Sequence, residues 1–146
     1  MRLIAIVAMM AALGCRDRTS CLEVAKRADA AETIARCTVE YERTRDPRAA
    51  VAAVTAHVAR AKDSKLQVGG VRDVREDDDA VVAWANRVGD VPEAALIWRR
   101  AAQVHERRGQ REAMLAAGHR ALELWAQAGA NGEATYEARV LQQAYW

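Results

Sequence analysis

The sequence predicts an all-α fold in which antiparallel helical hairpins stack into a short array of about seven helices. Alanine dominates the chain, phenylalanine is absent and only two prolines occur, and this composition favours helices. Turn signals recur in the first half of the chain about every seventeen residues, which is typical of a repeated helix-turn-helix unit. Between the turns, apolar residues return at every third or fourth position, as one face of a helix requires.

The first element is an export segment rather than part of this array. One positive charge at Arg2 precedes the apolar run Leu3–Leu13, and polar residues follow. This order is typical of a signal peptide, and the run is much shorter than the about 20 residues that span a bilayer as a helix. The alternative of a buried helix in a cytosolic protein is weaker, because the run has no polar face.

Residues 12–15, Ala-Leu-Gly-Cys, resemble the lipobox of bacterial lipoproteins, although that family usually has Leu at the first of these positions. The resemblance implies that residues 1–14 are removed and that Cys15 carries the lipid. Residues 15–19 then form the tether, and Arg16 after the cysteine implies the outer membrane, facing the periplasm. An ordinary secretory peptide cleaved near the same position is the alternative.

The first hairpin is predicted from two capping residues. Ser20, with Thr19 before it, is suited to the N-terminus of a helix over about 21–28, and Asp29 to that of a helix over about 30–44. The turn between these helices therefore lies at residues 28–29.

Two cysteines remain once Cys15 is assigned to lipid, and they suit an oxidising compartment. Cys21 and Cys37 lie at equal sequence distances before and after Asp29, and residues equidistant from the turn of an antiparallel hairpin face each other. We therefore expect a disulfide between them. Two separate buried thiols are the alternative.

The remaining helices follow from the apolar spacing and from two prolines. Pro47 and Pro92 suit the first turn of a helix, where the missing N–H is harmless. The expected helices cover about residues 48–61, 80–88, 92–106, 110–128 and 133–145. We expect Trp98 and Trp125 to fill space in the core between small residues.

An irregular insertion over about 63–79 interrupts the helices. Residues 65–68 and 71–74 alternate in polarity around Gly69-Gly70, which predicts a β-hairpin, with a mobile loop as the alternative. The acidic residues 77–79 suggest a cation site less than they suggest favourable charge at the start of the following helix.

Residues 89–94, Gly-Asp-Val-Pro-Glu-Ala, followed by Trp98 and Ala101, resemble the second helix of a tetratricopeptide repeat. A less regular match runs from Trp98 through Gly109 to Ala121. The two matches overlap, so one strict repeat register does not satisfy both. The resemblance implies a tetratricopeptide-like domain over residues 20–146 that binds a protein or peptide, typically to scaffold an assembly.

Chemical motifs give little support for catalysis. The chain has 22 basic and 20 acidic residues, which argues against a nucleic-acid partner. No phosphate-binding loop, zinc-spaced cysteine pair or esterase elbow occurs in the sequence, so we expect no catalytic residue, metal or cofactor. The histidines His57, His105 and His119 are expected at the surface or between helices.

The sequence therefore predicts a membrane-anchored, non-catalytic lipoprotein that binds an unidentified envelope protein or peptide. The terminal pair Tyr145 and Trp146 is a candidate partner contact, because exposed aromatic side chains suit an apolar surface. The alternative is a small-ligand-binding protein or an enzyme with its site where the 63–79 insertion meets the helices.

Overall fold

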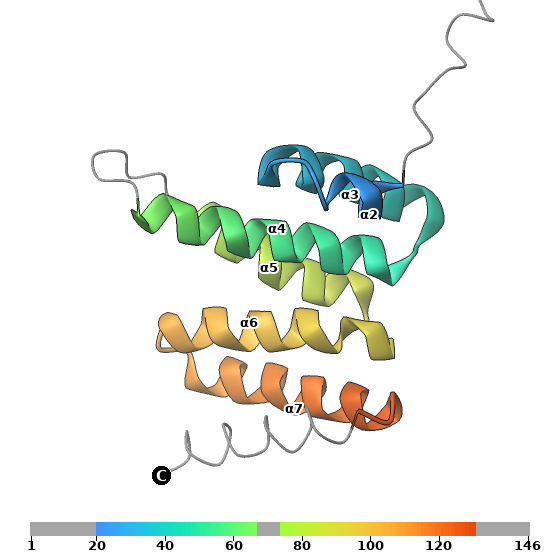
Figure 1. Cartoon of the computed structure of the whole chain (residues 1–146). Coiled ribbons are helices and arrows are strands. Elements are labelled where there is room, and N and C mark those ends of the chain that lie inside the picture. Colours follow the sequence, from blue (N-terminus) through green and yellow to red (C-terminus); the bar gives the residue numbers. More distant parts are fainter. Residues whose placement is uncertain (1–19, 67–73, 131–146) are drawn as a thin grey trace, which may run out of the picture.

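The computed structural model in Figure 1 describes residues 20–66 and 74–130. These ranges contain six α-helices and one short 3-10 helix, and no strand. The elements are α2 (Cys21–Val24), α3 (Ala30–Thr44), α4 (Pro47–Leu66), α5 (Arg75–Val88), η2 (Pro92–Ala94), α6 (Ala95–Arg107) and α7 (Arg111–Gln127). The all-α prediction is confirmed for this part of the chain.

The helices form a stack in which each long helix packs mainly on the next one along the chain. Figure 1 shows α3, α4, α5, α6 and α7 following one another in this order from one end of the stack to the other. The predicted helices 30–44, 92–106 and 110–128 match α3, η2 with α6, and α7 closely. The predicted helix 133–145 lies outside the described residues.

The predicted insertion over 63–79 is much too long. Helix α4 continues to Leu66 and α5 begins at Arg75, so residues 65–66 are helical and do not start a strand. The reason is that residues 62–66 contain neither glycine nor proline, and nothing stops the helix there. Residues 67–73 lie outside the described part of the chain, so the β-hairpin prediction is wrong for its first two residues and untested for the rest.

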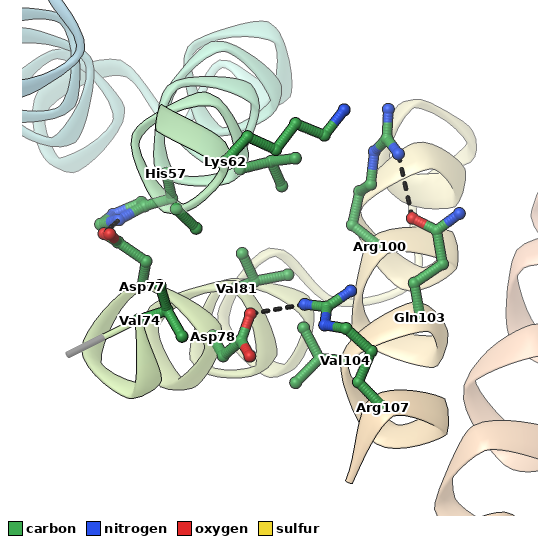
Figure 2. A pocket seen from close by; sticks show the side chains of 12 residues that line it. His57, Lys62, Val74, Asp77, Asp78, Val81, Arg100, Gln103, Val104 and Arg107 are labelled. Carbon is green, nitrogen blue, oxygen red and sulfur yellow. Dashed lines mark hydrogen bonds and ion pairs between the residues drawn. The ribbon is translucent and has the colours of Figure 1, made fainter. Parts of the chain in front are cut away.

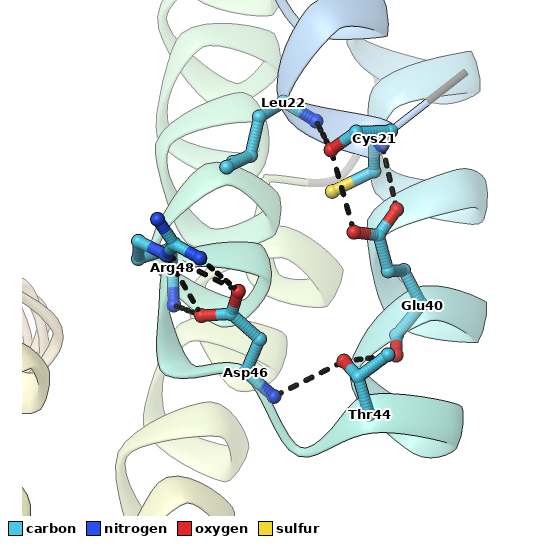
Figure 3. Close-up of polar contacts among 7 residues, drawn as sticks. Cys21, Leu22, Glu40, Thr44, Asp46 and Arg48 are labelled. Atoms are coloured by element: carbon cyan, nitrogen blue, oxygen red, sulfur yellow. Dashed lines mark hydrogen bonds and ion pairs between the residues drawn. The ribbon is translucent and has the colours of Figure 1, made fainter. Parts of the chain in front are cut away.

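The first helix is also shorter than predicted, but its caps are as expected. The side chain of Ser20 accepts a hydrogen bond from the Leu22 N–H at 3.2 Å, and Asp29 accepts one from the Glu32 N–H at 2.8 Å. Figure 3 shows a third contact, in which the Cys21 N–H donates to the Glu40 carboxylate of α3 at 2.6 Å. The start of α2 is therefore held by α3 as well as by its own cap.

Cys21 and Cys37 lie at disulfide distance between α2 and α3, with Cα atoms 5.0 Å apart. Both side chains are buried. The spacing about Asp29 therefore predicts their contact correctly. On the chain-entropy account, a bridge closing a loop of this size stabilises the fold by about 3 kcal/mol.

The ends of the helices are set by residues with positive φ. Gly109 has φ of 67° and follows α6, and Gly129 has φ of 75° and follows α7. Arg45 ends α3 with φ of 58°, a conformation that costs a non-glycine residue about 1 kcal/mol. After it, Asp46 binds the backbone N–H and the guanidinium of Arg48, which fixes the turn into α4 (Figure 3).

Small side chains let the helices pack closely. Eleven of the buried core residues in the described ranges are alanines, and the large side chains that are fully buried include Ile97, Leu124, Val54, Val81 and Val104. Tyr41 and Trp84 meet edge to face with ring centroids 5.2 Å apart, which joins α3 to α5. Trp98 and Trp125 are only half buried and pack against a smaller cluster around Leu124, so the core prediction holds for them only in part.

No helix in the described ranges combines the length and the apolar character that crossing a membrane demands.

Candidate functional site: a cleft between three helices

A cavity of about 130 Å³ opens where α4, α5 and α6 meet (Figure 2). Its lining combines valines with charged and amide side chains. The lining residues are His57, Val58, Ala61 and Lys62 from α4, Val74 before α5, Asp77, Asp78 and Val81 from α5, and Arg100, Gln103, Val104 and Arg107 from α6. The cleft lies near the C-terminal end of α4 and the N-terminal end of α5.

The buried side of the cleft is a polar network centred on Asp77. This side chain is only 1% exposed and accepts hydrogen bonds from His57 Nδ1 at 2.8 Å and from Arg60 Nε at 2.9 Å. A second Arg60 nitrogen binds the same carboxylate. Because a carboxylate only accepts, Nδ1 of His57 carries the proton in this contact. The network therefore ties α4 to α5.

Burial and hydrogen bonding act on Asp77 in opposite directions. Burial alone raises the pKa of this carboxyl, but the hydrogen bonds from Arg60 and His57, together with their charges, outweigh burial and hold the pKa below its usual range. Asp77 is therefore a carboxylate at neutral pH.

The outer side of the cleft carries basic groups from two helices. Figure 2 shows Lys62 extending from α4 toward the guanidinium of Arg100 on α6. Arg100 donates to Gln103 on its own helix at 2.9 Å. Deeper in the view, Arg107 donates to Asp78 at 2.6 Å and thereby joins α6 to α5.

The acidic residues 77–79 each bind a different partner, which corrects their expected role. Helix α5 starts at Arg75, and the residue before it makes no side-chain cap. Asp77 binds α4, Asp78 binds Arg107, and Asp79 binds Arg108 at 2.7 Å. Their charge does lie near a helix N-terminus, as expected, but their main contacts are ion pairs with neighbouring helices.

The described lining of the cleft contains a His–Asp pair. Its lining includes no Ser, Thr, Cys or Tyr that His57 would activate as a nucleophile. Within residues 20–66 and 74–130, no three His, Cys, Asp or Glu side chains gather closely enough to hold a metal ion. The arrangement can bind a ligand, and the charges of its side chains decide which kind.

Of the residues that the sequence analysis singles out, His57, Asp77 and Asp78 line the cleft. Cys15, Tyr145 and Trp146 are outside the described residues, and Cys21 and Cys37 are not part of the cleft lining. His57 lies between helices, His105 binds Gln110 at 2.7 Å and His119 is exposed, in keeping with their predicted interface or surface positions.

The cleft lies beside the 63–79 segment that the sequence analysis names for the alternative site. The sequence patterns did not identify the Asp77 network in it, although helix phase holds a signal for that network. Asp77 precedes the buried residues Val81 and Trp84 by four and seven positions, which places it on their face once α5 starts at Arg75. His57 likewise follows the buried Val54 by three positions. A charged residue that falls on the buried face of its helix therefore indicates a buried polar network of this kind.

No protein-family model matches the chain, and no curated protein or solved structure is significantly similar to it.

Proposed function

We propose that this chain is a lipid-tethered, non-catalytic module of a bacterial envelope, which binds a protein or peptide partner at the cleft between α4, α5 and α6. In this proposal the hairpins are arranged as in tetratricopeptide proteins and Cys15 holds the domain at the outer membrane. The cleft is the observation on which the binding part of the proposal depends.

The volume of the cleft favours a polypeptide over a small-molecule ligand. Pockets for drug-sized ligands usually enclose roughly 300–1,000 Å³. The cleft encloses about 130 Å³, which suits one side chain or a small ion. A partner that inserts one side chain would make its other contacts on the surrounding helix surfaces, as protein interfaces do with their central anchors.

A small-ligand-binding protein with its site in the same cleft is the second candidate. It is favoured by the convergence of polar groups from three helices and by the lowered pKa of Asp77. However, the two carboxylates of the lining are already engaged, Asp77 with Arg60 and Asp78 with Arg107. The polar groups that remain for a ligand, Lys62, Arg100 and Gln103, come from α4 and α6.

Site-specific photocrosslinking in intact cells tests the proposal. A photoreactive amino acid replaces Gln103 in the cleft of the full chain, and the matched control replaces Val39, which is 64% exposed on α3. We expect one discrete protein adduct from position 103 that is absent from position 39. The same adducts from both positions, or none from position 103, would contradict binding at the cleft.

The tether is tested separately. We expect Cys15→Ser to move the chain from the membrane fraction to the soluble fraction, because the lipid would be lost. Retention of the variant in the membrane pellet would contradict lipid anchoring and leave binding at the cleft as a separate question.

A further inference from the structure

Two cations at the mouth of the cleft have no acidic partner within the described residues. Lys62 takes part in no ion pair there, and Arg100 contacts only the neutral amide of Gln103. By contrast, Arg107 is bound to Asp78 at 2.6 Å, and Arg120, outside the cleft, is bound to Asp90 and Glu123. Lys62 and Arg100 thus differ from Arg107, the third cation of the cleft lining.

The charges around the cleft leave an excess of positive charge at its mouth. The lining has three cations, Lys62, Arg100 and Arg107, and two carboxylates, Asp77 and Asp78. Asp77 is paired with Arg60 and Asp78 with Arg107. No acidic side chain in the described ranges therefore compensates the charges of Lys62 and Arg100. Figure 2 shows both side chains extending toward the space between α4 and α6.

The surface next to these cations is apolar. Val58 on α4 and Val74 before α5 line the cleft and are partly exposed, together with the buried side chains of Val81 and Val104. A group that fills this space therefore needs a short aliphatic part as well as a negative charge. The cavity volume of about 130 Å³ limits it to roughly one side chain.

We propose that the cleft receives a glutamate side chain of the partner polypeptide, with its carboxylate between Lys62 and Arg100 and its methylene groups against the valines. The proposal rests on the proposed function, because it assumes a polypeptide partner, and it adds the chemistry by which that partner is recognised. Charge-assisted hydrogen bonds to Lys and Arg provide the specificity for a carboxylate over an amide.

A phosphate group fits this cleft less well. Its charge at neutral pH is close to −2, and Asp77 and Asp78 in the lining repel a dianion more strongly than a single carboxylate. Phosphate also has no aliphatic part to cover the valines. A lipid headgroup would in addition need a basic surface, whereas the formal charge of the whole chain is only +2.

Two matched peptide pools test the proposal with the full chain purified in detergent. Each pool contains nine-residue peptides with random flanks, and the central residue is Glu in one pool and Gln in the other. We expect the protein to retain the Glu pool about tenfold more than the Gln pool, as a charge-assisted contact of ordinary strength gives. Equal retention of the two pools would overturn the proposal.

Substitutions in the protein locate the binding. Lys62→Gln and Arg100→Gln are each expected to lower retention of the Glu pool several-fold, whereas Lys26→Gln, which removes an exposed lysine just after α2, is expected to leave it unchanged. Lys26 is a suitable control because it is exposed and is not part of the cleft lining. Circular dichroism checks that each variant is folded. A Glu preference that persists in both cleft variants would overturn the assignment to this site.

A charge swap and two other anions complete the test. The double variant Lys62→Glu with Arg100→Glu is expected to retain a pool with central Lys in place of the Glu pool. Binding of inorganic phosphate or phosphatidylglycerol vesicles that depends on Lys62, without a Glu preference, would overturn the proposal in favour of those anions. A specific crosslink from position 103 without any preference for the Glu pool would overturn the proposal of a glutamate side chain in the cleft. The proposed function, binding of a polypeptide at the cleft, would then still stand.

Discussion

Replacing Asp77 with Asn measures how much the buried network contributes to the stability of the helical stack. The substitution keeps the shape of the side chain but removes the charge that Arg60 and His57 bind at 2.9 and 2.8 Å. Breaking a buried ion pair from one side typically costs about 3–5 kcal/mol. Because the Arg60 side chain is 19% exposed and stays partly hydrated, we expect the lower end, about 3 kcal/mol.

Asp78→Asn is the matched control for this substitution. Asp78 also lies in the first turn of α5, so both variants lose the same favourable interaction with the helix dipole. Its partner Arg107 is 46% exposed, and an ion pair of this kind contributes about 1 kcal/mol or less. The difference between the two variants therefore isolates the buried network.

Urea unfolding at pH 7, followed by tryptophan fluorescence, provides the free energies by linear extrapolation. The buried Trp84 on α5 makes the signal sensitive to separation of α5 from its neighbours. Equal losses of stability in the two variants would refute the reasoning, because they would show that burial of Asp77 adds nothing to its ion pairs.

Four further predictions concern the pH response, one turn, the core and the cysteines. Because the pKa of Asp77 is lowered in the folded protein, the stabilisation by its carboxylate is present above the unfolded pKa of about 3.9 and is lost as the pH falls below that value. In an acid titration, the unfolding free energies of wild type and the Asp77→Asn variant should therefore become more similar as the pH falls. Gly109→Ala should cost about 1 kcal/mol in urea unfolding through its φ of 67° alone, since nothing lies within 4 Å of the added methyl; no loss would contradict a strained turn. Ile97→Ala should cost about 3 kcal/mol because Ile97 is fully buried, against almost nothing for Val39→Ala, and similar thermal midpoints for both would contradict this core. Cys37→Ser should lower the unfolding free energy by about 3 kcal/mol, and a reductant should destabilise wild type equally but leave the variant unaffected; a reductant-insensitive wild type would mean free thiols.

Local signals predicted much of the fold. Ser20 and Asp29 fixed the starts of the first two helices, since a capping side chain acts on the backbone two or three residues away. The cysteine pair followed from the symmetry of a single hairpin. The predicted end of α4 was wrong because it relied on an alternation of polarity over only four residues, 65–68. Residues 65–66 belong to the helix, which contains no glycine or proline after Pro47 to end it earlier.

The candidate site was less predictable because its contacts join distant parts of the chain. Asp77 binds His57 and Arg60, which precede it by 20 and 17 residues, and these contacts exist only after α5 folds back on α4. In the sequence the three acids at 77–79 are chemically equal. Helix phase buries the first and leaves the third exposed, so their different roles follow from packing rather than from composition.

The cross-link between α2 and α3 has a mechanical consequence if the chain is held through its N-terminal side. A pull on residues before Cys21 would otherwise load α2, which has only four residues and few hydrogen bonds of its own. The covalent bridge from Cys21 carries that load directly into α3 at Cys37, in the middle of a helix of 15 residues. Under tension α2 is thus bypassed, and the force is borne by the body of the stack.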